Sequence, residues 1–179
     1  MRNLINRLAV GVGICLAIVF CASAVFAVNP ATISVTVTIQ NLSVSATGPI
    51  AFGIVLVSTT TVSGSASTVT NDGNTTETYD IKLTNPAGWT ATSGAPGSET
   101  YRLSAQFNGS APTAGSFDAD HDLTTTDQTS SGTIFAGGET GLSVAAAATR
   151  SLWFKFEAPT STTVTTEQAI TVTVTAAAG

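Results

Sequence analysis

The sequence predicts an all-β protein, an antiparallel β-sandwich preceded by an N-terminal signal helix. Apolar and polar residues alternate with period two in several short runs, as in strands that bury one face. Clusters of glycine, proline and asparagine separate these runs, as turns do. Charged residues make up 9% of the chain, against about 25% in ordinary domains. Threonine, whose β-branched side chain favours sheets, is the commonest polar residue.

Residues 1–27 have the three parts of a secretory signal peptide. Arg2 and Arg7 flank the start of an uncharged apolar run, and Val25 and Ala27 stand where a signal peptidase needs small residues. The apolar run is also long enough to cross a bilayer, so a retained anchor is the alternative. We expect cleavage, which leaves residues 28–179 as a single β-sandwich domain that is secreted or held at the cell surface.

Both cysteines, Cys15 and Cys21, lie inside this signal. The exported domain must therefore hold together without disulfides, by its core alone. The formal net charge of −5 argues against nucleic acid as a partner, and against binding to anionic lipid by charge. We expect no membrane contact after signal cleavage.

The first and last runs of the exported chain are the most regular. Residues 33–40 place Ile33, Val35, Val37 and Ile39 on one face and hydroxyl side chains between them. Residues 169–176 repeat the pattern with isoleucine and valine. Each run predicts a half-buried strand.

Three central runs, residues 79–84, 101–107 and 152–157, predict further strands because apolar residues occupy alternate positions. We interpret residues 108–131 as a long connection between strands or a variable insert. Strands separated by turns about every ten residues favour a Greek-key, immunoglobulin-like sandwich. The expected core comprises Phe52, Tyr79, Ile81, Leu83, Trp89, Phe154, Phe156, Val172 and Val174.

These turn and core residues also carry a resemblance. The chain resembles secreted bacterial immunoglobulin-like modules of the alpha-galactosidase-associated, CARDB-like and ASPM/SPD-2/Hydin-like kinds. The matching positions are Phe52, Gly53, Asn71, Gly73, Asn74, Tyr79, Leu83, Pro86, Gly88 and Trp89. The resemblance implies a fold and says little about function. A weaker resemblance, to camelysin/TasA-type biofilm fibre subunits, rests on secretion, a cysteine-poor chain and similar length.

No catalytic set is evident in the exported chain. His121 is the only histidine, there is no G-x-S-x-G elbow and no thiol remains after the signal, so the base and nucleophile of a triad are missing. We expect a non-enzymatic protein in which His121 is a solvated loop residue.

The sequence offers two candidate binding sites, each with a structural alternative. Asp118, Asp120 and Asp122 alternate in a loop and could converge on Ca²⁺, although Leu123 and Thr129 stand where an EF-hand needs glycine and glutamate. An acidic solvated loop is the alternative, and no other cofactor is expected. Trp153 could stack on a sugar ring if it lies on an exposed sheet face, or it could be buried.

The expected function is a non-catalytic structural or adhesion role at the cell surface or in the extracellular matrix, with fibre assembly as one form of it. The alternative is a carbohydrate-binding module that uses Trp153. For assembly, Ile33, Val35, Val37 and Ile39 would add to the sheet edge of a neighbour. Pairing of this strand within its own domain is the competing interpretation. The partners would be other copies, other surface proteins or glycans.

Overall fold

The computed structural model describes residues 30–179. The predicted signal, residues 1–27, lies outside the described residues. The chain divides into two units, residues 1–38 and 39–179, and the second of these contains the strands. Their bounds are β1 Val44–Ala46, β2 Thr60–Val62, β3 Ser67–Asn71, β4 Glu77–Thr84, β5 Thr90–Ala91, β6 Thr100–Phe107, β7 Gln128–Thr129, β8 Thr149–Glu157 and β9 Thr171–Ala178.

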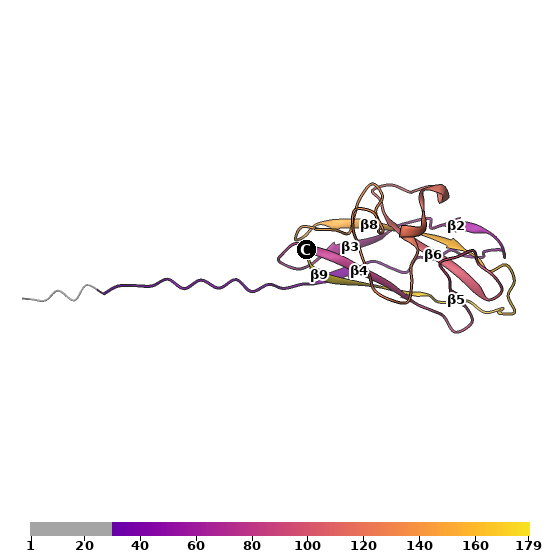
Figure 1. Ribbon diagram of the computed structural model, residues 1–179, viewed down its shortest axis with the longest axis horizontal. Coiled ribbons are helices and arrows are strands. Elements are labelled where there is room, and N and C mark those ends of the chain that lie inside the picture. The colour runs from indigo at the N-terminus through magenta and orange to yellow at the C-terminus, as the bar shows by residue number, and fades with distance from the viewer. Residues whose placement is uncertain (1–29) are drawn as a thin grey trace, which may run out of the picture. The chain divides into compact units, whose positions relative to one another are not determined.

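The strands form two sheets (Figure 1). The larger sheet has the order β1-β3-β8-β6-β5, with β2 also paired to β8, and the smaller sheet has the order β7-β4-β9. Within residues 39–179 every strand pair is antiparallel except the short pair of β5 with β6. The chain passes from the larger sheet to the smaller one between β3 and β4, between β6 and β7 and between β8 and β9, and it returns between β4 and β5 and between β7 and β8. The predicted all-β sandwich fold is confirmed.

The core lies between the two sheets. Alternate side chains of β4, β6 and β8 are buried there because residues two apart on a strand share a face. Of the nine expected core residues, Tyr79, Ile81, Leu83, Phe154 and Phe156 are buried. The other four pack against the core and stay partly exposed: Phe52, Trp89, Val172 and Val174.

The turn between β3 and β4 shows why its sequence is rich in asparagine and glycine. The buried Asn71 side chain donates hydrogen bonds to the carbonyls of Thr75 and Val144, each at 2.8 Å. A Cβ atom on Gly73 would lie 2.5 Å from the carbonyl oxygen of Asn41. Only glycine therefore lets the chain before β1 approach this turn so closely.

The structure differs from prediction at the first expected strand. Residues 30–43 contain no strand, and the side chains of Ile33 and Ile39 are 88% and 78% exposed. The alternation shows which side chains would share a face, but a strand also needs a neighbouring edge, and no partner for residues 33–40 is present among the described residues. The last strand forms as expected, starting at Thr171 rather than residue 169.

The long connection after β6 is ordered and covers the outer face of the larger sheet. It contains two 3-10 turns, η1 Ala114–Ser116 and η2 Ala119–His121, followed by β7. Polar residues on the outer face of β6 and β8, including Ser104, Gln106 and Lys155, are buried beneath it. In the part of the chain that the structure describes, no helix has the length and apolar character to span a membrane.

Candidate functional site

The amino-terminal segment, residues 30–43, ends in a fixed root. Asn74 holds this root, because its side-chain amide donates to the carbonyl of Ile39 and its Oδ1 accepts from the backbone N–H of Asn41, both at 2.8 Å. The N–H of Ser43 donates to Glu77 at 2.7 Å. The side chains of Val35 and Val37, which precede this root, are both 82% exposed. The segment is thus anchored at one end and presents apolar side chains to water.

Among the described residues, β9 is an edge strand, with half of its backbone groups not bonded to β4. It is the last strand of the smaller sheet, bound on one side to β4 over eight residues. The N–H of Gly179 donates to the carbonyl of Thr76 on the β4 side. Because hydrogen-bonding directions alternate along an antiparallel strand, residues 172, 174, 176 and 178 point their N–H and C=O groups away from β4.

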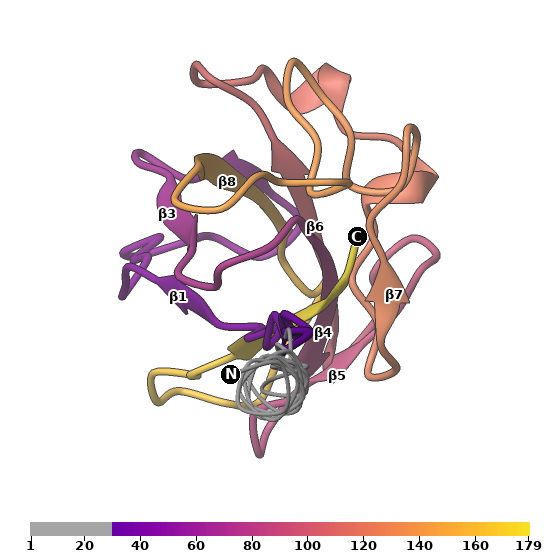
Figure 2. The same cartoon turned by 90° about the vertical axis from the view of Figure 1, so that its left-hand side faces the viewer.

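The core is incompletely covered at β9. Leu83, Ile81 and Tyr79 of β4 are at most 1% exposed. Their direct partners on β9 share the same inward face and are nevertheless partly exposed: Val172, Val174 and Ala176. Strand β1, at the end of the opposite sheet, lies close to β9; Figure 2 labels β1 and also β4, the strand to which β9 is bound. An apolar strip of the core therefore reaches the surface beside β9.

Both β9 and residues 33–40 lack the features that usually protect an edge. Neither contains proline, and neither contains a charged residue. Natural sheets block exposed edges with such residues, because a bare edge can pair with another chain. Among the described residues, the amino-terminal segment and the β9 edge are therefore two surfaces without edge protection, and each is by itself a candidate surface for pairing with another chain.

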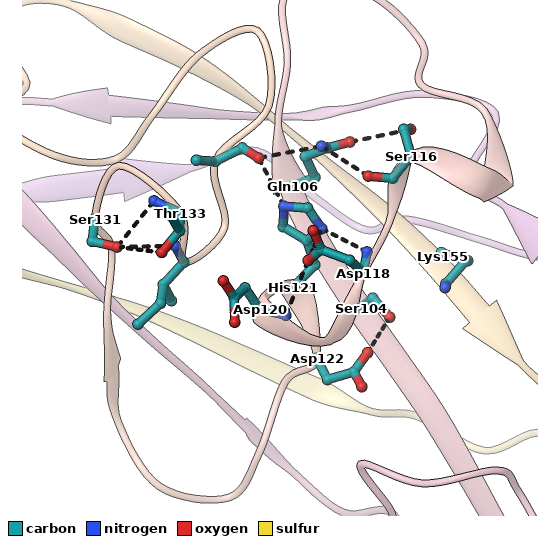
Figure 3. A network of polar contacts seen from close by, with 12 residues as sticks. Ser104, Gln106, Ser116, Asp118, Asp120, His121, Asp122, Ser131, Thr133 and Lys155 are labelled. Carbon is teal, nitrogen blue, oxygen red and sulfur yellow. Dashed lines mark hydrogen bonds and ion pairs between the residues drawn. The ribbon is translucent and has the colours of Figure 1, made fainter.

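The three aspartates proposed for calcium do not converge (Figure 3). Asp118 caps η2 and accepts from the N–H of Asp120 at 3.0 Å, whereas Asp122 points to the hydroxyl of Ser104 at 2.7 Å. Alternation places residues on one face only in an extended chain, and the 3-10 turn between them, with about three residues per turn, turns the side chains in different directions. Among residues 30–179 no group of three or more acidic, histidine or cysteine side chains could hold a metal ion.

His121 is a buried structural residue rather than a solvated one. Its side chain is 3% exposed. Nδ1 accepts the backbone N–H of Asp118 at 2.9 Å, and Nε2 lies 2.7 Å from the carbonyl oxygen of Ala136. Since Nδ1 accepts, the neutral ring carries its proton on Nε2 and donates it to that carbonyl. Both ring nitrogens are used in fixing the loop.

A charged cluster lies under the same loop. Arg102 on β6 donates to both carboxylate oxygens of Glu157 on β8, at 2.5 and 2.7 Å. Lys155, 6% exposed, lies 3.0 Å from Glu157 and 5.5 Å from the ring centre of Phe117. Sequence reasoning missed this cluster, although the period-two pattern already placed Lys155 and Glu157 on one face.

The two carboxyl groups of the cluster are shifted in opposite directions. Burial raises the pKa of Asp122 above its usual value, and the hydrogen bond from Ser104 and the charge of Arg102 only partly offset it. Burial also tends to raise the pKa of Glu157, but hydrogen bonds from Arg102 and Lys155 outweigh it and bring that pKa below its usual value. Glu157 is therefore the carboxylate that holds the two basic side chains in place.

Trp153 is tied to its own chain through its indole nitrogen. It lies on the outer face of β8 and is partly buried, and its indole N–H donates to the carbonyl of Asn108 at 2.8 Å. The bond ties β8 to the start of the long connection. The indole nitrogen of Trp153 is therefore engaged within the chain, while part of the side chain stays exposed.

The chain matches no protein-family model, no curated protein and no solved structure. The resemblance to immunoglobulin-like modules therefore stays a prediction from sequence motifs, and the resemblance to fibre subunits stays one from the predicted secretion, the cysteine-poor chain and its length.

Proposed function

We propose that this protein is a secreted, non-catalytic structural subunit of the cell surface or extracellular matrix, which assembles with other copies by donating its amino-terminal segment as a strand. One observation supports the proposal above all: residues 33–40 have the pattern of a half-buried strand, yet they form no strand in the described part of the chain, and their four apolar side chains are at least 78% exposed.

The energetic argument concerns burial. Moving a valine or isoleucine side chain from water into a core is worth about 1.5–3 kcal/mol. Burial of four such side chains, together with a row of backbone hydrogen bonds, would make binding of this segment to a neighbour's sheet edge favourable. Adjacent threonine and serine side chains would face water, as on an ordinary sheet surface.

The positions of the candidate reactive side chains also agree with a structural role. His121 is enclosed, the aspartates are separated, and the charged cluster is covered by the long connection. Trp153 is held by its own chain, so no observation favours the carbohydrate-binding alternative.

The test changes the apolar face of the segment without removing its root at Asn74. We expect Val35→Asp combined with Val37→Asp to abolish assembly seen by sedimentation and negative-stain microscopy, because two carboxylates would have to be buried. The matched control, Ser34→Asp with Thr36→Asp, adds the same charge to the opposite face and should still assemble. A wild-type protein that stays monomeric at all concentrations would refute the proposal.

A further inference from the structure

We infer that the acceptor for the amino-terminal segment is the free edge of β9 in a second copy of this chain. This inference rests on the proposed function and adds which surface receives the donated strand. In the assembled form, Ile33, Val35, Val37 and Ile39 of one molecule would cover the open strip of core beside β9 in the next.

Strand β9 matches the amino-terminal segment in length. Strands β1, β2, β5 and β7 have two or three residues each, whereas β9 has eight. The donor pattern also covers eight residues, 33–40. A strand gains stability from each hydrogen-bonded pair and each cross-strand contact. Among the strands that end the two sheets, only β9 is long enough for all of residues 33–40 to pair with it.

Strand β9 and residues 33–40 also share the same alternation of apolar and hydroxyl side chains. On β9, valines point toward the core and Thr171, Thr173 and Thr175 point away from it. The donor has the same alternation of branched apolar and hydroxyl side chains. When the two strands pair, apolar residues meet on the core side, and threonines meet on the water side, where cross-strand threonine pairs are favourable.

The inward side chains of β9 are incompletely buried. Val172 and Val174 are partly exposed although their β4 partners are fully buried. The side chains of one further strand would complete this burial. Neither strand carries a charge, so pairing leaves no charged group without a partner.

The segment of the same molecule is the competing occupant. Its root at Asn74 lies three residues from Glu77, which pairs with Ala178 at the end of β9. Residues 33–38 form no strand, and the side chains of Ile33, Val35 and Val37 are at least 82% exposed. Donor and acceptor are also different surfaces, so exchange between molecules forms a head-to-tail contact that can repeat without closing.

Disulfide trapping tests the inference, because the described residues contain no cysteine. In chains with Cys15→Ser and Cys21→Ser, one set of molecules carries Val35→Cys or Val37→Cys, and a second set, of different tag length, carries Val172→Cys or Val174→Cys. The sets are mixed, allowed to assemble in reductant and then oxidised. Since a disulfide needs Cβ atoms about 3.5–4.5 Å apart, we expect a mixed disulfide for at least one of the four combinations.

The matched control is Thr36→Cys, which lies in the same segment but on the opposite face. It should not link to either valine position of β9. Assembly without a mixed disulfide, or equal linking by Thr36→Cys, would overturn the β9 assignment and leave the proposed function standing. A third chain carries both Val35→Cys and Val174→Cys; a disulfide that forms only within this chain, and never between the two sets, would show self-pairing and also overturn the β9 assignment. No assembly under any condition would refute both.

Discussion

At the scale of single residues, the aromatic side chains between the sheets carry much of the stability. Phe156 lies 5.5 Å from Phe52, 6.0 Å from Trp89 and 5.8 Å from Tyr101, measured between ring centres. Phe154, two residues earlier on the same face, is 6% exposed. With no cysteine in the described residues, no disulfide compensates for a weakened core.

Truncation of Phe154 should therefore be costly. We expect Phe154→Ala to lower the free energy of unfolding by about 3–5 kcal/mol, since it removes buried surface and leaves a cavity. Urea unfolding of the monomer followed by tryptophan fluorescence measures the change. Ile54→Ala serves as the control, because the Ile54 side chain is 99% exposed. An unchanged unfolding midpoint for Phe154→Ala would contradict the described orientation of β8.

Glu157 should make the fold sensitive to acid. Its pKa is lower in the folded state than in the unfolded chain, so its contribution to stability is complete above the unfolded pKa, near 4.5. That contribution is lost as the pH falls below this value and through the folded pKa. Glu157→Gln should therefore reduce stability at pH 7 and weaken its dependence on pH in this acid range.

Urea unfolding measured between pH 7 and pH 3 tests this expectation. Asp122 acts in the opposite sense, because its raised pKa means that protonation relieves a cost of folding as the pH falls. The control is Asp127→Asn, which removes an exposed ion pair with Lys82 and should have little effect. If Glu157→Gln retains the full acid dependence of the wild type, another carboxyl group is responsible.

At the scale of elements, the sequence predicted a strand correctly where the alternating apolar residues face the core and the strand has hydrogen-bonded neighbours. The runs in β4, β6 and β8 formed as expected because each has hydrogen-bonded neighbours and faces the core. Residues 33–40 have an equally clear alternation and form no strand. Period two describes the side chains, whereas pairing depends on which edges the rest of the fold leaves open.

The candidate site was predictable in part. The unprotected character of residues 33–40 and of the last strand is visible in sequence, because proline and charge are absent from both. The covering of Trp153 and Lys155 was not predictable, since it depends on where the long connection folds back. The separation of Asp118 from Asp122 depends on a single 3-10 turn, which is too short to leave a periodic pattern.

At the scale of the whole molecule, the proposed export would determine which residue begins the proposed donor segment. Cleavage after Ala27 would leave Val28 as the first residue, close to the donor strand. We expect N-terminal sequencing of material recovered outside the cell to begin at Val28, and circular dichroism of that material to show sheet with little helix. Recovered protein that still begins at Met1 would contradict the proposed secretion.

An edge that accepts a strand and a segment that donates one give any polymer of this protein two chemically different ends. One terminal molecule would keep a bare β9, and the molecule at the other end would keep an unpaired amino-terminal segment. A peptide with the sequence of residues 33–40 would bind only the first kind of end and would stop growth there. Such a polymer would thus be directional, and a cap that binds one kind of end would limit its length.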